Sequence, residues 1–246
     1  MNLVVAGATG RTGSEIVAEA SGRGHAVSGV ARSADGVGDV RVSPAGKLPD
    51  LLEDADALVD FTVPEASREH AARAADAGVA YVVGTTGFDD GGIADLREVG
   101  ETVPVMKAAN FARGVRALLE VVDAGVAALP DYDVELTETH HRGKRDAPSG
   151  TADTILDVVE DARDGALDRT YGREGEHERD DAEVGVHVRR AGTVRGEHEV
   201  LLAGNDEVLS LSHRAESRRV FAAGAVDAAE WLAGREPGWY DFGDVP

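Results

Sequence analysis

Short apolar runs alternate with longer segments of helical periodicity over the first 110 residues. Glu65–Ala77 is one of the helix-like segments that lie between two such runs. Strands that alternate with helical crossovers are typical of a parallel sheet. The pattern therefore predicts an α/β domain with a doubly wound parallel sheet. Its predicted strands are Leu3–Ala6, Ala26–Ala31, Ala57–Phe61, Val79–Val83 and Val103–Met106.

The pattern changes after residue 110. Apolar residues at helical spacing predict an amphipathic helix at about Arg113–Ala128, followed by a strand at Tyr132–His140 and a helix at Ala152–Ala162. The polar stretch 164–181, rich in Gly, Glu and Arg, is interpreted as a mobile surface connection. Beyond it a period of two predicts an antiparallel meander, one face of which needs a partner. We expect a central α+β domain with an open mixed or antiparallel sheet, with strands around Val184–Val188, Val200–Leu202 and Val208–Leu211.

Composition narrows the classes of function. Of the 246 residues, 46 are Asp or Glu and 25 are Lys or Arg, which gives a formal net charge of −21. Nucleic acids and anionic membranes bind basic surfaces, so we expect neither as a partner. The chain contains no cysteine, which excludes thiol nucleophiles, cysteine-ligated zinc and iron–sulfur clusters.

The basic residues are unevenly divided, because all but three of them are arginine. With carboxylates spread along the chain, this balance is interpreted as an acidic, halophile-like surface; a GC-rich genome that favours Arg and Asp is the alternative. The start of the chain lacks a basic region followed by a long apolar one, and no apolar run of 18 residues occurs. We therefore expect a cytoplasmic protein without a membrane segment.

A glycine turn follows the first predicted strand directly and opens a helix. Its sequence, GATGRTG, has the spacing GxxGxxG, with Thr9 where the standard dinucleotide fingerprint has its second glycine. Glycines allow close backbone approach, and the helix start presents free N–H groups to a pyrophosphate. An ordinary strand-to-helix turn is the alternative. The turn favours a Rossmann-like domain, with cofactor contacts from Gly7, Ala8, Thr9, Gly10, Arg11 and Thr12.

The end of the second strand bears on the choice of cofactor. An NAD-binding protein usually carries a carboxylate there, whereas this chain has Ala31 and Arg32. Arg32 can meet a 2′-phosphate, with Ser33 as a further hydroxyl donor, unless it is simply a solvated surface arginine. We therefore expect NADPH as the cofactor, with NADH possible but weaker.

Two more segments lie at carboxyl ends of predicted parallel strands, the edge where doubly wound folds bind ligands. Taken singly, each is better explained by a turn or a core contact. The candidate cofactor contacts there are Gly84, Thr85, Thr86, Ala108, Ala109, Asn110 and Phe111.

The densest group of candidate residues runs from Glu138 to Thr151, where a strand ends and a helix begins. In this acidic chain it is a cationic island, with an adjacent pair of histidines and Lys144 among arginines, and it would attract an anionic substrate. The helix start, at Ser149, Gly150 and Thr151, can bind a carboxylate and would accept a phosphate nearly as well. A charged loop with an ordinary helix cap is the alternative.

The two adjacent histidines, His140 and His141, suit proton transfer better than metal binding. If strand geometry continues through both, they point to opposite sides, so no metal site is expected and one of them can act as a proton donor. The remaining histidines singled out, His70, His187 and His213, are interpreted as structural.

The chain closely resembles the dihydrodipicolinate reductase family over nearly its whole length. The resemblance runs in order through GATGRTG, DFTVPEASREHA, GTTGF, AANF, ETHHRGKRDAPSGTA, RAGTVRGEHEV and SHRAESRRVFAAGAVDAAEWL, and the histidine-to-PSGT block is the most specific of these. The resemblance implies that His140 donates a proton with assistance from Lys144. It also implies substrate contacts from His141, Gly150 and Thr151, to which the helix start adds Ser149, and cofactor contacts from the residues given above.

The resemblance further implies reduction of 4-hydroxy-tetrahydrodipicolinate, a small dicarboxylate, in diaminopimelate and lysine biosynthesis. It implies a dinucleotide-binding domain of residues 1–110 and 215–246, completed by a helix at about Ser217–Leu232. Residues 111–214 would form a substrate-binding domain whose open sheet builds a homotetramer. The chain departs from the family at Ala31, where an acidic residue is frequent, and at Ala112 and Arg113, after AANF.

Two other classes of function were weighed. An extended short-chain dehydrogenase or epimerase shares the glycine turn but needs a Tyr with a Lys four residues later, and no tyrosine of this chain has one. A non-catalytic nucleotide sensor would keep the glycine turn but would have no use for the cationic island. Oxidation of NADPH on addition of substrate separates the reductase from the sensor.

Overall fold

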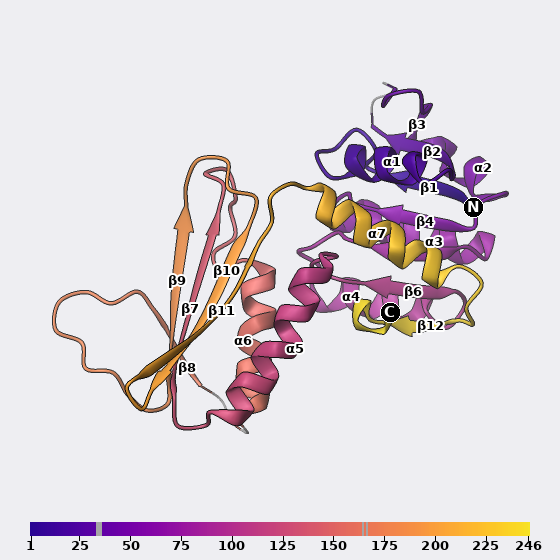
Figure 1. Cartoon of the computed structure of the whole chain (residues 1–246). Helices are drawn as coiled ribbons and strands as arrows, with labels where there is room; N and C mark the ends of the chain where they lie inside the picture. The colour runs from indigo at the N-terminus through magenta and orange to yellow at the C-terminus, as the bar shows by residue number, and fades with distance from the viewer. Residues whose placement is uncertain (33–35, 164, 166) are drawn as a thin grey trace. The chain divides into compact units, whose positions relative to one another are not determined.

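The computed structural model divides the chain into two compact units and describes residues 1–32, 36–163, 165 and 167–246. Unit 1 comprises Met1–Ala112 and Arg218–Pro246, and unit 2 comprises Arg113–Ser217. The boundaries expected from the sequence, 110/111 and 214/215, lie within three residues of these divisions. Figure 1 labels the elements of both units. Ser33, the expected hydroxyl donor, lies outside the described residues.

Unit 1 is built on a seven-stranded sheet of order β12-β6-β5-β4-β1-β2-β3. All of its pairings are parallel. Because parallel neighbours need a crossover connection, helices separate most of the strands along the chain. The strands are β1 (Asn2–Ala6), β2 (Ala26–Ala31), β3 (Val42–Pro44), β4 (Ala57–Asp60), β5 (Ala80–Val83), β6 (Pro104–Lys107) and β12 (Gly238–Tyr240). The predicted doubly wound parallel sheet is confirmed, and β3 and β12 extend it.

Helices cover both faces of this sheet, and each face has its own apolar core. Along β1, Leu3 and Val5 face the core under α1 and α7, whereas Val4 and Ala6 face the core under α2, α3 and α4. This alternation explains the continuous apolar runs, since a strand covered on both sides buries every side chain. The helices are α1 (Gly13–Gly22), α2 (Leu48–Leu52), α3 (Pro64–Ala77), α4 (Asp90–Val99) and α7 (Arg219–Leu232), with short 3₁₀ turns at Ala45–Lys47 and Phe242–Asp244.

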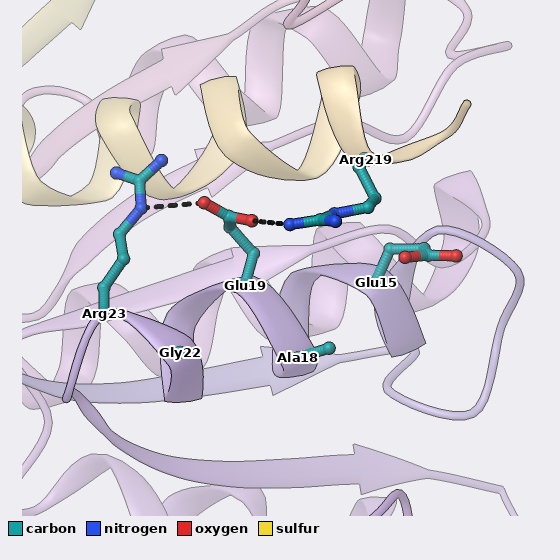
Figure 2. A pocket seen from close by; sticks show the side chains of 6 residues that line it. All are labelled: Glu15, Ala18, Glu19, Gly22, Arg23 and Arg219. Atoms are coloured by element: carbon teal, nitrogen blue, oxygen red, sulfur yellow. Dashed lines mark hydrogen bonds and ion pairs between the residues drawn. The ribbon is translucent and has the colours of Figure 1, made fainter. Parts of the chain in front are cut away.

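The C-terminal helix α7 is an integral part of unit 1. It packs against α1 and against β4, β5 and β6. Figure 2 shows the polar side of the α1–α7 contact, where Glu19 lies between Arg23 and Arg219. Arg23 also reaches Asp227 of α7, at 2.8 Å between Nη1 and Oδ1. Residues from both ends of the chain therefore close one face of the sheet.

Unit 2 contains a five-stranded sheet of order β11-β10-β7-β9-β8 with two helices on one face. Leu118 and Val122 of α5 (Arg113–Ala128) and Ile155 and Leu156 of α6 (Gly150–Ala162) pack onto alternate strand residues such as Leu136. The sheet is therefore apolar on its helix side and largely polar on the other. Its strands are β7 (Asp133–His140), β8 (Asp168–Tyr171), β9 (Glu183–Arg190), β10 (Glu197–Gly204) and β11 (Glu207–Arg214).

The strand order corrects the expected antiparallel meander. β9 pairs in parallel with β7 and β8 and does not pair with β10, so the sheet is mixed. The physical reason is that the chain returns to the starting end of the sheet twice, through α6 before β8 and through residues 172–182 before β9. Among the described residues of this sheet, β10 forms its antiparallel pairs with β7 and with β11. The β10–β11 loop turns at Asn205 and Asp206, whose φ angles of 49° and 60° suit a tight hairpin.

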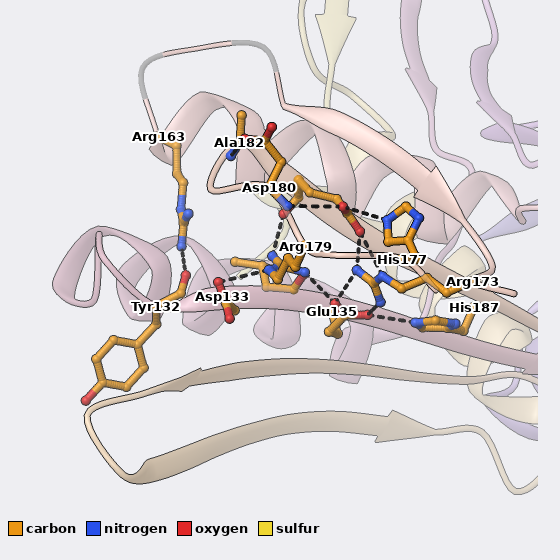
Figure 3. Close-up of polar contacts among 12 residues, drawn as sticks. Tyr132, Asp133, Glu135, Arg163, Arg173, His177, Arg179, Asp180, Ala182 and His187 are labelled. Atoms are coloured by element: carbon orange, nitrogen blue, oxygen red, sulfur yellow. Dashed lines mark hydrogen bonds and ion pairs between the residues drawn. The ribbon is translucent and has the colours of Figure 1, made fainter. Parts of the chain in front are cut away.

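The expected surface connection at 164–181 was wrong in part, because Asp168–Tyr171 forms β8. Figure 3 shows how the following residues are attached to the sheet. The Glu135 carboxylate of β7 accepts hydrogen bonds from Arg173, at 2.8 and 3.0 Å, and from Arg179, at 2.5 Å. His187 of β9 completes the group, with 2.7 Å between its Nε2 and Glu135 Oε2. A polar composition gave no sign of these long-range ion pairs.

Among the described residues, none of the helices is both long and apolar enough to span a bilayer.

A substitution at Gly224 tests how closely α7 packs against the rest of unit 1. A Cβ added there would lie 1.7 Å from the Phe111 carbonyl oxygen, so Gly224→Ala must displace the backbone. We expect a loss of about 1–3 kcal/mol in the free energy of unfolding, measured by urea denaturation. The control is Gly22→Ala at the end of α1, where nothing lies within 4 Å and the change should be neutral or stabilising. Equal stability of the two variants would contradict the close packing of α7.

Candidate active site

The glycine turn between β1 and α1 is too tight for side chains at two of its positions. Gly7 has φ +79°, and a Cβ on it would lie 2.5 Å from the Phe61 carbonyl oxygen. A Cβ on Gly13 would lie 2.1 Å from the Gly7 carbonyl oxygen. Between them, Thr9, Gly10 and Arg11 are exposed. The turn therefore brings the start of α1 to the carboxyl edge of the sheet, an arrangement that can bind a pyrophosphate.

The end of β2, which Arg32 follows, is hydrogen-bonded to this turn. The N–H groups of Gly7 and Ala8 both donate to the Val30 carbonyl, at 2.9 and 3.2 Å, so the turn is tied to the end of β2. Ala31 is the last residue of β2, and Arg32 follows it with an exposed side chain. An exposed guanidinium beside a pyrophosphate-binding turn can pair with a further phosphate.

Gly84 and Thr85 follow β5 at the same edge of the sheet. A Cβ on Gly84 would lie 2.2 Å from the Phe61 ring, so only glycine fits there. Thr85 is 3% exposed, and its hydroxyl accepts hydrogen bonds from the Ser67 hydroxyl at 2.8 Å and from the Thr62 N–H at 3.0 Å. The Thr85 side chain is therefore engaged within the protein, whereas Thr86 is exposed.

A buried carboxylate underlies this edge, and the sequence gave no sign of its contacts. Asp60, at the end of β4, is fully buried and accepts hydrogen bonds from the Thr62 hydroxyl at 2.6 Å and the Tyr81 hydroxyl at 2.7 Å. His70 Nδ1 lies 2.7 Å from the same carboxylate, which agrees with a structural role for that histidine. Burial and the neighbouring Asp60 carboxylate raise the pKa of Tyr81 well above its usual value. This cluster fixes the loop that follows β4.

The segment after β6 divides into buried and accessible residues. The Phe111 ring is 1% exposed and packs between Phe61 and Phe242, at centroid distances of 5.8 and 5.2 Å. Ala108 donates its N–H to Val83, while Ala109 is exposed. The Asn110 side-chain oxygen accepts the Ala112 N–H at 2.8 Å. Phe111 and the equally buried Ala8 therefore expose almost no surface at this edge.

In unit 2, the end of β7 carries a buried carboxylate and a histidine on the same side of the strand. Glu138 Oε2 lies 2.6 Å from His140 Nδ1. Both Glu138 oxygens accept from the Arg190 guanidinium at 2.7 Å, and Oε1 also accepts the Ser149 N–H at 3.0 Å. Burial alone would raise the pKa of Glu138, but hydrogen bonds from His140 and Arg190 outweigh it and lower the pKa to about 2. The carboxylate is therefore ionised at neutral pH.

Ser149 caps the start of α6, and its side chain also contacts a residue of the sheet. Its Oγ accepts the Ala152 N–H at 3.3 Å and lies 3.2 Å from Nε2 of His198 on β10. His198 is 2% exposed, and its ring lies 5.2 Å from the His140 ring. Burial lowers the pKa of His198 to about 3, so the ring is neutral. The sequence interpretation did not single out His198, although it lies in the motif RAGTVRGEHEV.

The remaining predicted substrate residues lie in the loop after β7 and in the first turn of α6. β7 ends at His140, so the expected alternation does not continue through His141, whose Nδ1 accepts the Gly143 N–H at 3.2 Å. Lys144 forms an ion pair with Asp146, at 2.8 Å. In α6, Gly150 is exposed and Thr151 is buried.

Space remains beside the outer nitrogen of His140. A Cβ on Gly196 would lie 3.1 Å from His140 Nε2, so the absence of a side chain there leaves this nitrogen uncrowded. Within the described part of the chain, no group of three or more His, Asp or Glu residues could hold a metal ion. The arrangement can donate or accept a proton at Nε2, next to a helix start and a lysine that suit an anion.

Comparison with known proteins covers both units. Residues 1–111 match the family model described as dihydrodipicolinate reductase, N-terminus, and residues 114–245 match the one described as dihydrodipicolinate reductase, C-terminus. The chain is 77% identical to a 4-hydroxy-tetrahydrodipicolinate reductase of Natronomonas pharaonis, covering 100% of both chains. It is 53% identical to the reductase of that name from Haloarcula marismortui, covering 99% and 98%.

Among solved structures, the fold is similar to a dipicolinate-bound dihydrodipicolinate reductase from Paenisporosarcina sp. TG-14. The TM-score is 0.78 at 21% sequence identity, with 98% of this chain and 97% of that chain covered. The parallel sheet of unit 1 and the mixed sheet of unit 2 thus occur together in a known reductase fold. With both of its units matched by the family models, the chain belongs to the dihydrodipicolinate reductase family of oxidoreductases.

Proposed function

We propose that the chain reduces 4-hydroxy-tetrahydrodipicolinate to tetrahydrodipicolinate in diaminopimelate and lysine biosynthesis, with NADPH as the preferred cofactor. The observation that carries this proposal is the group formed by His140, its buried partner Glu138 and the capped helix start at Ser149. It offers a proton donor and an anion-binding helix start side by side. A biosynthetic reductase of this family fits a cytoplasmic location.

The residues of unit 1 fit a dinucleotide, because glycine is required where the backbone must approach closely and Arg32 is exposed nearby. When bound, the reduced nicotinamide supplies the hydride. The glycine turn, Gly7 to Thr12, would bind the pyrophosphate, and Arg32 would pair with the 2′-phosphate. The exposed Thr86 and Ala109 and the backbone near Gly84 would line the sheet edge that holds the rest.

The residues of unit 2 would bind the dicarboxylate and supply a proton. The α6 start, through the N–H groups of Gly150 and Thr151, and the Lys144 ammonium would neutralise a carboxylate, with His141 as a further contact. The 4-hydroxyl and a hydrogen of the neighbouring ring carbon would leave as water, which gives an unsaturated ring. That ring would receive the hydride on one atom and the proton from His140 Nε2 on another, so one hydride and one proton enter and one water leaves. The proton on Nδ1 stays in its hydrogen bond to Glu138.

Replacing the proposed acid tests this assignment. We expect His140→Gln to lower kcat by roughly 10²–10⁴-fold, followed as loss of NADPH absorbance with freshly made substrate. His187→Gln is the matched control, because His187 also pairs with a glutamate at 2.7 Å but on the polar face of the sheet. Normal turnover in His140→Gln would show that another group protonates the product. A wild-type protein that binds NADPH without oxidising it would favour the nucleotide sensor.

The proposed cofactor preference rests on Arg32. Because a hydrogen bond to a charged group contributes about 1.5–3 kcal/mol, Arg32→Asp should raise KM for NADPH by roughly 10–100-fold and leave KM for NADH nearly unchanged. Steady-state kinetics with each cofactor measure both constants. Arg73→Asp is the control, since Arg73 is exposed on α3 and pairs only weakly with Asp76 at 3.5 Å. Equal effects of Arg32→Asp on the two cofactors would contradict the assignment.

We also propose a homotetramer built through the sheet of unit 2. This proposal is supported by the resemblance and by the side of the sheet opposite α5 and α6, where Val208 is 62% exposed. Sedimentation equilibrium in molar salt should give about four times the chain mass of 25.7 kDa. If the acidic surface is salt-adapted, the tetramer and the melting temperature should both decline on removal of salt. A monomer at all salt concentrations would reject the assembly.

A further inference from the structure

The buried Glu138 carboxylate contacts the proposed acid His140, at 2.6 Å, but no step of the reduction has yet been assigned to it. We propose that Glu138 is a positioning residue for the reduction: it fixes the ring orientation and the protonation pattern of His140. The proposal rests on the proposed function, in which His140 is the acid. It concerns contacts within unit 2 alone.

Glu138 and His140 are brought together by the register of β7. Residues two apart on a strand point to the same side, so Glu138 and His140 lie together without any contribution from a loop. Their 2.6 Å contact is short, as expected for a charge-assisted hydrogen bond. An ionised carboxylate can only accept, so the proton of this hydrogen bond belongs to His140 Nδ1. Nε2 is then the nitrogen at which the ring gains or gives its exchangeable proton.

The carboxylate itself is rigidly held. Arg190 of β9 holds both Glu138 oxygens, and the Ser149 N–H adds a fourth hydrogen bond. The Arg190 guanidinium also donates to the Asp146 carbonyl at 2.6 Å. Glu138 is thus fixed from two strands, the loop after β7 and the start of α6. The single buried carboxylate of Glu138 therefore fixes the position of the proposed acid relative to the start of the proposed substrate-binding helix.

The groups around His140 come from three strands and the following loop. On its own strand it faces Glu138; from β9 comes Arg190, which already pairs with Glu138; from β10 comes His198, which is neutral. In the following loop Lys144 is paired with Asp146. Among the described residues, Glu138 is the anion in hydrogen-bond contact with His140. It is therefore placed to hold the Nδ1 proton and the ring orientation while Nε2 gives up its proton.

Glu138→Gln removes the charge and keeps the shape. We expect kcat at neutral pH to fall by roughly 10–10²-fold, as for other groups that orient a functional histidine, with KM for substrate and cofactor changed less than threefold. The pH dependence of kcat should also differ from that of the unaltered protein. Glu135→Gln is the matched control, because it removes a carboxylate from the same strand that binds arginines and His187 but not His140. An unchanged kcat and pH profile in Glu138→Gln would overturn the proposal.

A double-mutant cycle separates positioning from a general structural role. If Glu138 acts through His140, adding Glu138→Gln to His140→Gln should change kcat less than threefold. A further loss as large as that in the wild-type background would overturn the proposal. The two failures remain distinguishable: normal kcat in His140→Gln alone defeats the proposed acid, whereas a loss in that variant with none in Glu138→Gln defeats only the role of Glu138.

Glu138→Gln leaves the Arg190 charge without its partner, so a loss of kcat by misfolding must be distinguished from a loss of positioning. A second variant background, Arg190→Gln, makes this distinction. In Arg190→Gln the Glu138 carboxylate is the unbalanced buried charge, so adding Glu138→Gln should raise the urea midpoint of unfolding while lowering kcat. A purely structural role requires stability and kcat to move in the same direction. A kcat that recovers together with stability would therefore overturn the proposal.

Discussion

A carboxylate that is removed from water must receive hydrogen bonds at both oxygens, and in each unit this requirement organises the end of a central strand. Asp60 gathers hydrogen-bond partners from the loop after β4, from α3 and from β5, and Glu138 gathers them from β7, β9 and the start of α6. Because an unpaired buried charge is far more costly than a paired one, these contacts form together or fail together. In unit 2, Glu138 holds both the proposed acid His140 and the start of the proposed substrate-binding helix at Ser149.

The fold class followed from the sequence because its signal is local. Apolar runs bounded by helical segments describe a doubly wound sheet, and the strands predicted at Ala26–Ala31 and Ala57–Phe61 match β2 and β4 to within a residue. The error concerned pairing. A period of two reports that a segment is a strand but not which neighbour it joins, so the parallel β7–β9 pair was missed although α6 was predicted between them. β8 was missed because its four residues are mostly polar.

The sequence likewise predicted only part of the candidate site. The sequence predicted the positions of the glycine turn, of His140 and of the start of α6, since each lies at a recognisable strand end or helix start. It could not predict which side chains face inward, so Thr85 and Phe111 were expected as ligand contacts although both are buried. It also gave no sign of the Ser149–His198 contact, which joins residues 49 positions apart. Motif spacing identifies a site, whereas burial and long-range pairing decide what each residue in it can do.

The position of α7 in the sequence also determines the order in which the two units can fold during synthesis. Unit 2 is one continuous segment, complete once residue 217 has left the ribosome, whereas unit 1 needs residues 218–246 to cover one face of its sheet. Domains form as units when their whole sequence becomes available. The segment inserted in the middle can therefore acquire its native structure first, while the apolar surface of the earlier sheet waits for the helix translated last.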